Sequence, residues 1–425
     1  MSPCGSNARA THEAADRSHP TWPALLDVAP ESEGIDLGGV RRYRLSRVRA
    51  EMAARSIGAL ILSDSVNIRY ATGTRNMQVF TSRNAPARYL VLTADRSVLH
   101  EFTGCEHLAA GFDTVDEVRP ATTASFVAAG AAIAERERRW ADEISSLLVE
   151  LLGPGPQTVG LERLNAGAAM SLAGNGHRLV DAQEPVEMAR AIKSPAEVDC
   201  IRASLRMTER AVAAMRDALA PGLTENELWA VLHRSVIAGN GDYCETRLLN
   251  SGPRTNPWFQ EASSRVIGPN ELVLLDTDVV GCHGYYADFS RTFHVGPDEP
   301  SAEQRTRYRA AHEQLQHNMA IIGPGVTFRE YSERAWDIPD AFHTNRYYLS
   351  AHGCGMTGEY PYLYHRADYA EAGYDGVIKP GMTLCVESFI GGETGEGVKL
   401  EQQLLVTETG TELLSEFPFE ADLLR

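Results

Sequence analysis

Acidic residues interrupt apolar segments in the last third of the chain. Asp276 and Asp278 end one apolar run, Asp288 lies in the next apolar segment, and Glu387 and Glu401 each interrupt a later one. On an extended strand, side chains two residues apart point to the same face, so Asp276 and Asp278 are predicted to project together. The spacing therefore indicates several carboxylates in or beside a sheet.

Buried carboxylates need a positive partner. Burial of one without compensation is costly, and like charges that share a site cannot all stay ionised. We expect a multivalent cation here, with His352 in the Ala351–Gly355 segment, predicted to be a flexible loop, as the nitrogen ligand. Five carboxylates and one imidazole favour Mn, Fe, Co or Zn in a paired site over calcium or a thiolate site. A single Asp at a strand end is more often a cap or an ion-pair partner, so the hypothesis rests on the whole set.

Composition restricts the classes of function. The chain has 425 residues and a formal net charge of -17. This length predicts two domains, and the acidic balance, without a basic patch, disfavours nucleic-acid and membrane-surface binding. Neither a membrane-spanning run nor a secretion signal is found, which predicts a cytoplasmic location. Seven scattered cysteines without a CxxC pair indicate reduced thiols.

The elements that must position the acids fall into two groups. Residues 1–20 lack periodicity and are predicted to be a disordered leader. Alternating helical and strand patterns predict an α/β N-terminal domain over 21–190. Its expected elements are a helix at 43–56, strands at 58–63 and 89–93, a long helix at 121–152 and a strand at 158–161.

Capping boxes predict the helices of the second domain, over 191–425. Ser194 to Glu197, Thr224 to Glu227 and Ser301 to Gln304 each place a hydroxyl three residues before a Glu or Gln. Strands then dominate, which predicts an α+β arrangement. The expected strands cover 271–277, 285–295, 383–389 and 398–407.

The order of these motifs resembles the metal motif of the creatinase, prolidase and methionine aminopeptidase relatives, the M24 or pita-bread superfamily. The residues that carry it are Asp276, Gly284-Tyr285, Asp288 with Ser290-Arg291-Thr292, His352-Gly353-Cys354-Gly355, Val386-Glu387 and Leu400-Glu401. Over about residues 37–415 the resemblance implies an α/β N-terminal domain, a pita-bread catalytic domain and a homodimer. It also implies one or two metal ions per chain, held by Asp276, Asp278, Asp288, His352, Glu387 and Glu401.

Two features differ from the peptidases of this superfamily. Trp258 stands where they carry a substrate-handling His after Ser251-Gly252, and Met356 to Pro361 holds no second His. The loss of both imidazoles removes proton-handling groups for amide cleavage. Hydrolysis of a C–N bond, as in Xaa-Pro peptidases, creatinases or ectoine hydrolases, therefore stands as the alternative function, and a non-catalytic binding protein as a third.

The chain looks most like the DddP-type dimethylsulfoniopropionate lyases. The shared segments are Thr255 to Trp258, Asn76 to Val79, Gly104 to Leu108, and the extra residue between Asp276 and Asp288. The resemblance implies β-elimination of dimethylsulfoniopropionate to dimethyl sulfide and acrylate, with iron as the expected metal and manganese, zinc and cobalt as alternatives.

The catalytic side chains follow from the same resemblance. Trp258, Tyr347 and Tyr360 could hold the sulfonium by cation–π contact, or could simply pack in the core. Those lyases carry the proposed base, an Asp, six residues after the ligand His, where this chain has Gly358. Glu359 is the expected substitute, although an extended chain would point it to the other side; His365 and Asp368 are further candidates.

Overall fold

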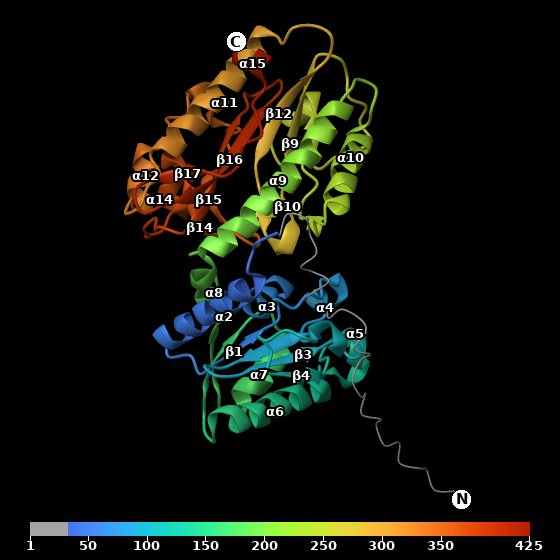
Figure 1. Ribbon diagram of the computed structural model, residues 1–425, viewed down its shortest axis with the longest axis vertical. Helices are drawn as coiled ribbons and strands as arrows, with labels where there is room; N and C mark the ends of the chain where they lie inside the picture. The colour runs from blue at the N-terminus through green and yellow to red at the C-terminus, as the bar shows by residue number, and fades with distance from the viewer. Residues whose placement is uncertain (1–32) are drawn as a thin grey trace, which may run out of the picture.

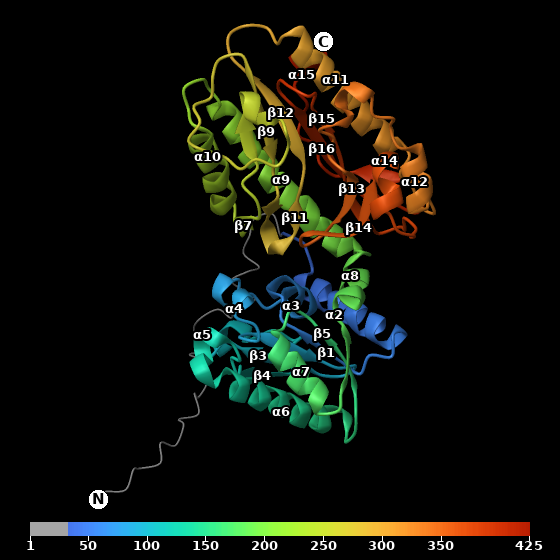
Figure 2. The same ribbon diagram turned by 180° about the vertical axis from the view of Figure 1, so that it is seen from behind.

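The computed structural model describes residues 33–425 and shows two parts stacked end to end (Figures 1 and 2). The predicted leader at 1–20 lies outside the described residues. The N-terminal part is an α/β layer, and the C-terminal part is the predicted α+β pita-bread arrangement. The fold class is therefore confirmed.

The N-terminal part is built on a six-stranded sheet of order β4-β3-β2-β1-β5-β6. Central strands β1 and β2 are wholly buried, because helices cover both faces. Leu60 and Leu62 pack on one face with α2, whereas Ala59 and Ile61 pack on the other with Trp140 of α6. The strands are β1 (Ala59–Leu62), β2 (Tyr89–Leu92), β3 (Ser97–Glu101), β4 (Glu117–Pro120), β5 (Thr158–Leu161) and β6 (Arg178–Asp181). The helices are α2 (Leu37–Ala54), α3 (Ser65–Thr72), α4 (Val79–Arg83), α5 (Phe126–Ala129), α6 (Ile133–Leu152), α7 (Ala166–Gly174) and α8 (Gln183–Arg190).

The long helix predicted at 121–152 is continuous only from Ile133. Before it lie the short α5 and a 3-10 turn, joined at Gly130, whose φ of +54° no right-handed helix contains. The prediction was wrong for the first turns because the Ala-rich composition favours helix and hides the effect of this glycine.

The C-terminal part has one long antiparallel sheet, β14-β13-β15-β16-β17, beside the three-stranded sheets β12-β9-β8 and β11-β10-β7. Thr292 Oγ1 of β12 donates to Lys399 O of β16 over 2.9 Å, which joins the β12-β9-β8 sheet to the five-stranded sheet. The strands are β7 (Tyr243–Cys244), β8 (Leu249–Ser251), β9 (Glu271–Asp276), β10 (Val279–Val280), β11 (Tyr286–Ala287), β12 (Ser290–Val295), β13 (Leu349–Cys354), β14 (Gly358–Tyr364), β15 (Thr383–Ile390), β16 (Val398–Val406) and β17 (Thr411–Leu413).

Helices cover the outside of these sheets, with α9 and α10 along one side and α11 and α12 along the other (Figures 1 and 2). All three predicted capping boxes are present, and Thr327 with Glu330 forms a fourth. The helices are α9 (Pro195–Ala218), α10 (Glu225–Ala238), α11 (Ala302–Ala320), α12 (Phe328–Arg334), α13 (Asp340–His343), α14 (Arg366–Ala372) and α15 (Ala421–Leu424).

Two strand predictions need correction. The segment 285–295 is two strands, β11 and β12, because the chain turns at Asp288 and Phe289 between them. The segment around His352 is not a flexible loop but strand β13, paired on both sides with β14 and β15. The glycines of this segment favour a loop in the sequence, but pairing with the two neighbouring strands makes it a strand.

Buried ion pairs join the two parts. The proposed boundary at residue 190 falls between α8 and α9, and on either side of it Arg190 and Lys193 both pair with Glu359 of β14. Arg44 of α2 donates to the Tyr285 hydroxyl, which in turn donates to Glu197 over 3.0 Å. Within residues 33–425, no helix is long and apolar enough to cross a bilayer.

Candidate metal centre

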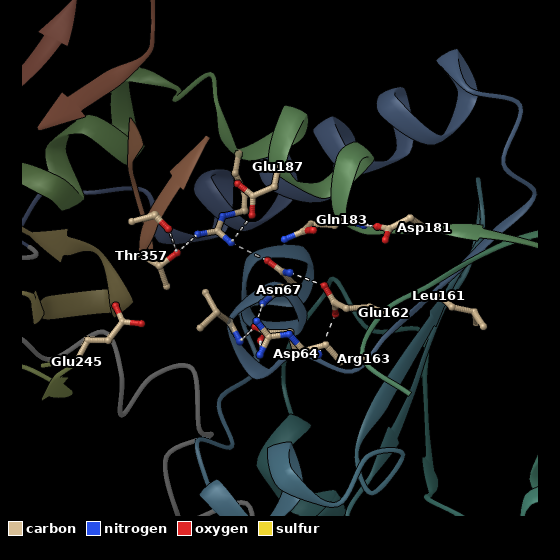
Figure 3. Close-up of a pocket in the computed structure, with 13 residues that line it drawn as sticks. Asp64, Asn67, Leu161, Glu162, Arg163, Asp181, Gln183, Glu187, Glu245 and Thr357 are labelled. Carbon is tan, nitrogen blue, oxygen red and sulfur yellow. Dashed lines mark hydrogen bonds and ion pairs between the residues drawn. The ribbon is translucent and has the colours of Figure 1, made fainter. Parts of the chain in front are cut away.

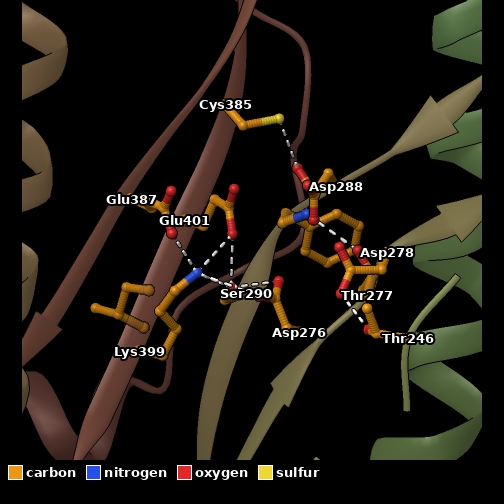
Figure 4. Close-up of polar contacts among 12 residues, drawn as sticks. Thr246, Asp276, Thr277, Asp278, Asp288, Ser290, Cys385, Glu387, Lys399 and Glu401 are labelled. Carbon is orange, nitrogen blue, oxygen red and sulfur yellow. Dashed lines mark hydrogen bonds and ion pairs between the residues drawn. The ribbon is translucent and has the colours of Figure 1, made fainter. Parts of the chain in front are cut away.

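Strands of the five-stranded sheet and of the β12-β9-β8 sheet bring the predicted acids together (Figure 4). Pairing of β15 with β16 places Glu387 directly opposite Glu401, and pairing of β9 with β12 places Asp276 opposite Ser290. Asp288 lies in the turn that leads into β12. Residues far apart in the sequence therefore meet where the two sheets adjoin.

The potential ligand atoms form two groups, in each of which they lie within 4.8 Å of one another. One group is Asp276, Asp278 and Asp288, and the other is Asp288, His352, Cys385 and Glu401. Asp288 belongs to both groups. If each group held a cation, Asp288 would be shared between the two.

Asp278 reaches the cluster for a reason other than strand alternation. Strand β9 ends at Asp276, and Asp278 has a φ of +40°. Its carboxylate accepts hydrogen bonds from the Tyr286 hydroxyl, over 2.8 Å, and from Thr246. The predicted proximity of Asp276 and Asp278 is present, but a turn and two hydroxyl groups produce it.

Several carboxylate oxygens in the cluster lack a hydrogen-bond partner. These buried atoms are Asp288 Oδ1, Glu387 Oε1 and Glu401 Oε1. An unsatisfied buried acceptor costs about 1–3 kcal/mol, and more when it is charged. Three such oxygens in one cluster fit a cation that binds them, so the residues present suit the metal that the sequence predicts.

The imidazole of His352 is oriented as a metal ligand would be. Its Nδ1 lies 2.9 Å from the carbonyl oxygen of Gly353, to which it can donate. This leaves Nε2 facing the cluster, 3.5 Å from both Asp288 Oδ2 and Glu401 Oε1. A ring nitrogen fixed by a backbone carbonyl is the usual support for a ligating histidine.

Lys399 is a member of the site that sequence reasoning missed. Its ammonium lies 2.9 Å from Glu387 Oε2, 2.9 Å from Glu401 Oε2 and 3.3 Å from Asp276 Oδ2. Period-two spacing puts Lys399 on the same face of β16 as Glu401, and a lysine inside an apolar strand was the available signal. One ammonium and one imidazole cannot neutralise five buried carboxylates, so the need for a cation remains.

The pKa shifts show where negative charge is least compensated. Burial, opposed by Lys399, raises the pKa of Asp276 to about 6, and burial together with the Asp276 charge raises that of Asp278 to about 7. Burial and Glu401 raise the pKa of Asp288 well above its usual value. For Glu401 burial is outweighed by Lys399 and His352, which hold its pKa below the usual range. The cation requirement is therefore greatest at Asp278 and Asp288.

Aromatic side chains form a wall beside Lys399. The ammonium lies 5.1 Å from the ring centroid of Trp258 and 5.9 Å from that of Tyr347. Phe259 connects these two rings, with centroid separations of 5.8 Å to each. Two of the three predicted aromatic residues thus border the acid cluster, whereas Tyr360 packs against Phe328 and Tyr374.

Glu359 does not lie where a base would be needed. Its buried carboxylate accepts a hydrogen bond from Arg190 Nε over 2.9 Å and another from Lys193 Nζ. Arg190 and Lys193 therefore engage this carboxylate at the junction between the two parts. Adjacent residues of strand β14 point to opposite sides, so Glu359 points away from His352, which Gly358 faces. The structure therefore gives no support to the expected role of Glu359 as the base.

Neither of the other two substitute bases belongs to the ligand groups of the acid cluster. Asp368 forms a bidentate ion pair with Arg346, at 2.6 and 3.0 Å. His365 is buried, and burial lowers its pKa to about 4. None of the candidates named from the sequence therefore supplies a free proton acceptor at the acid cluster.

A polar pocket of about 370 Å³ opens between the two parts beside Gly358 (Figure 3). Thr357 and Gly358 line one side, and Glu245 and residues of α3 and α8 line the others. A Cβ atom at Gly358 would lie 3.7 Å from His352 Nδ1, in ordinary contact. The position six residues after the ligand histidine is therefore open and adjoins that histidine on its Nδ1 side.

Comparisons with known proteins agree with this architecture. The metallopeptidase family M24 model matches residues 199–408, and the creatinase/prolidase N-terminal domain model matches residues 44–192. The dimethylsulfoniopropionate lyase DddP of Roseovarius nubinhibens is 35% identical over 396 residues, which cover 92% of this chain and 88% of that protein. DddP of Roseobacter denitrificans is also 35% identical, with the same coverage.

Solved structures of peptidases share the fold at lower identity. Dipeptidase PepE of Mycobacterium ulcerans superposes with a TM-score of 0.72 at 21% identity, covering 91% of this chain and 98% of that one. An Xaa-Pro dipeptidase of Bacillus anthracis gives 0.70 at 22% identity, covering 89% and 99%. With both domain models matched in order and the curated lyases aligned over most of their length, this chain belongs to the M24 metallopeptidase family of enzymes and carries that family's creatinase/prolidase N-terminal domain.

Proposed function

We propose that this protein is a metal-dependent lyase that cleaves dimethylsulfoniopropionate, or a close analogue, into dimethyl sulfide and acrylate. The observation that carries the proposal is the aromatic wall of Trp258 and Tyr347 set directly against the acid cluster. A β-sulfonium carboxylate has a cation at one end and an anion at the other. The aromatic rings suit the sulfonium, and metal ions held by the acid cluster would suit the carboxylate. The similarity to two DddP proteins supports the same substrate class.

The proposed ligands are Asp276, Asp278, Asp288, His352, Glu387 and Glu401, holding two ions of iron or, alternatively, of manganese, zinc or cobalt. When bound, the metal supplies Lewis-acid stabilisation of the charge that develops on the substrate carboxylate as the adjacent carbon loses its proton. Lys399 adds a fixed positive charge beside Glu387 and Glu401. In the elimination the α-proton passes to solvent water, the electron pair of the broken C–H bond forms the C=C bond of acrylate, and dimethyl sulfide leaves the β-carbon with the electron pair of the C–S bond.

The aromatic residues orient the substrate for that elimination. Trp258 and Tyr347 already lie within 6 Å of one cation, the Lys399 ammonium. A desolvated cation over such a ring gains about 2 kcal/mol. A sulfonium held against the same wall has its carboxylate end toward the acid cluster and its leaving group away from it. Trp258 and Tyr347 are thus the proposed substrate-binding residues.

The proposal is tested by incubating metal-loaded protein with dimethylsulfoniopropionate. Gas chromatography should detect dimethyl sulfide, and liquid chromatography an equal amount of acrylate. A parallel incubation with Xaa-Pro dipeptides tests the alternative, hydrolysis of a C–N bond. Release of proline without dimethyl sulfide at high enzyme concentration would replace the lyase proposal with the hydrolase.

We also propose that two copies of the chain associate. Exposed apolar side chains lie on the short helices α4 and α5, which are both found toward the same side of the N-terminal part (Figures 1 and 2): Val79, Phe80, Phe126 and Val127. Exposed apolar patches mark interaction surfaces. Light scattering on the purified protein should give twice the mass of one chain; a monomeric mass at micromolar concentration would refute the association.

A further inference from the structure

One thiol lies among the oxygen and nitrogen ligands. Cys385 Sγ is within 4.8 Å of potential ligand atoms of Asp288, His352 and Glu401. The predicted ligand set, drawn from acids and one imidazole, left this residue out. Cys385 is fully buried, and its sulfur donates a long, weak hydrogen bond of 3.6 Å to the backbone carbonyl of Asp288 (Figure 4).

Strand register explains why this sulfur faces the site. In the antiparallel pair of β13 and β15, Cys385 stands directly opposite His352, so the two side chains share a face. Glu387 is two residues further along β15 and therefore projects to that same face. Hence β15 offers both a thiol and a carboxylate to the region between the sheets.

An independent observation indicates that a ligand belongs at this position. Asp288 Oδ1 and Glu401 Oε1 are buried without hydrogen-bond partners, and their residues are 2% and 1% exposed. Both belong to the group that contains Cys385. A cation bound by these oxygens and by His352 Nε2 would lie next to the sulfur.

We propose that Cys385 is a sulfur ligand of the ion held by Asp288, His352 and Glu401. On binding, the thiol releases its proton to solvent and the thiolate sulfur donates an electron pair to the metal. A thiolate favours zinc, cobalt or ferrous iron over manganese and magnesium, whereas the Asp276, Asp278 and Asp288 group is purely oxygen. The two positions of the centre therefore differ in metal preference. This inference rests on the proposed metal centre but not on the proposed substrate.

The chain provides a matched control in Cys354. It lies two residues after His352 on β13, on the same face, and is also fully buried. Its sulfur is contacted by Gln403 Nε2 at 3.2 Å and is not a member of either ligand group. Cys354 contacts Cys385, so Cys354→Ser removes the neighbouring thiol while it leaves the sulfur of the proposed ligand in place.

The experiment is cobalt substitution of the full chain under a phosphine reductant, which adds no thiol of its own. Wild-type protein and Cys354→Ser should show the visible bands of bound cobalt together with a near-ultraviolet sulfur-to-cobalt charge-transfer band. Cys385→Ser should keep the visible bands and lose the charge-transfer band. The zinc affinity of Cys385→Ser should fall by at least about 10- to 100-fold, which is the loss seen when a residue that only supports a metal ligand is removed. Its manganese affinity should change less.

Each other outcome is decisive. Visible cobalt bands without a charge-transfer band in the wild type, or a charge-transfer band that survives in Cys385→Ser, would overturn the sulfur ligand and leave the carboxylate centre standing. A charge-transfer band lost only in Cys354→Ser would identify Cys354 as the sulfur ligand and would also refute the proposal. Failure of the wild type to bind cobalt would refute the metal centre itself.

Discussion

Trp258 and Tyr347 should set the affinity for a cationic substrate, because their rings lie within 6 Å of an ammonium in the folded protein. Trp258→Ala should raise KM for dimethylsulfoniopropionate about 10- to 30-fold, since loss of a desolvated cation–π contact of up to about 2 kcal/mol corresponds to that factor. Trp258→Phe keeps a ring and should retain most of the affinity. Steady-state kinetics of the three proteins test this, and an unchanged KM in Trp258→Ala would remove Trp258 from the binding site.

Gly358 is the residue at which this chain differs most consequentially from the lyases it resembles. The position adjoins His352 and has room for a side chain. Gly358→Asp should raise the rate of dimethyl sulfide release, because a positioned general base contributes about 10²- to 10⁴-fold.

Gly358→Asn is the matched control, since it has the same size but cannot accept the α-proton as a carboxylate does. Initial rates measured by gas chromatography should rank Asp above Asn and wild type. Equal rates for Asp and Asn would show that position 358 does not face the reacting carbon.

At the scale of elements, β14 divides two roles between adjacent residues. Gly358 faces the imidazole of His352, and Glu359 faces the junction with α8 and α9, where Arg190 and Lys193 pair with it. Glu359→Gln leaves two buried cations with reduced compensation and should lower the free energy of unfolding by about 3–5 kcal/mol.

Urea unfolding measures that loss, and metal content and turnover per folded molecule should stay near wild type. Glu143→Gln, which breaks an exposed ion pair with Arg139, is the control and should change stability by less than about 1 kcal/mol. Loss of turnover in Glu359→Gln with stability intact would instead restore Glu359 as the base.

Sequence patterns predicted the elements that are determined locally and missed those that tertiary contacts determine. Capping boxes located α9, α10 and α11 because their hydrogen bonds lie within four residues. Strand β13 was missed because its Gly-rich sequence gains strand geometry only from β14 and β15. For the same reason, the spacing of the carboxylates predicted a cluster but did not predict that Lys399 and Cys385 belong to it. It also did not predict the ion pairs of Arg190 and Lys193 with Glu359.

At the scale of the whole molecule, the acid cluster couples metal binding to stability. The folded pKa of Asp278 is about 7 against an ordinary value of 3.8. Because the folded state binds this proton more tightly than the unfolded state does, the contribution to the free energy of unfolding is fully present below the ordinary pKa of 3.8. It is lost as the pH rises through the folded pKa of about 7. The metal-free protein should therefore melt at a lower temperature at pH 8 than at pH 6.

Bound metal should reverse this trend, because its ligands must be ionised. A metal concentration a hundred times the dissociation constant stabilises the fold by about 2.7 kcal/mol. At one fixed metal concentration the gain should be larger at pH 8 than at pH 6, because binding is tighter when the ligands are ionised. Thermal melts with and without a chelator at both values check the sign. A metal-free melting temperature that rises from pH 6 to pH 8 would contradict the assignment of uncompensated carboxylates to this cluster.

The central claim, that two ions share Asp288, is tested most directly by metal analysis of the purified chain and of Asp288→Asn after metal-supplemented expression. The wild type should hold two ions per chain, and Asp288→Asn should lose both, because its carboxylate belongs to each ligand group. Asp298→Asn, at an exposed position beyond β12, should keep both ions. A wild type without metal, or an Asp288→Asn variant that retains two ions, would contradict the account.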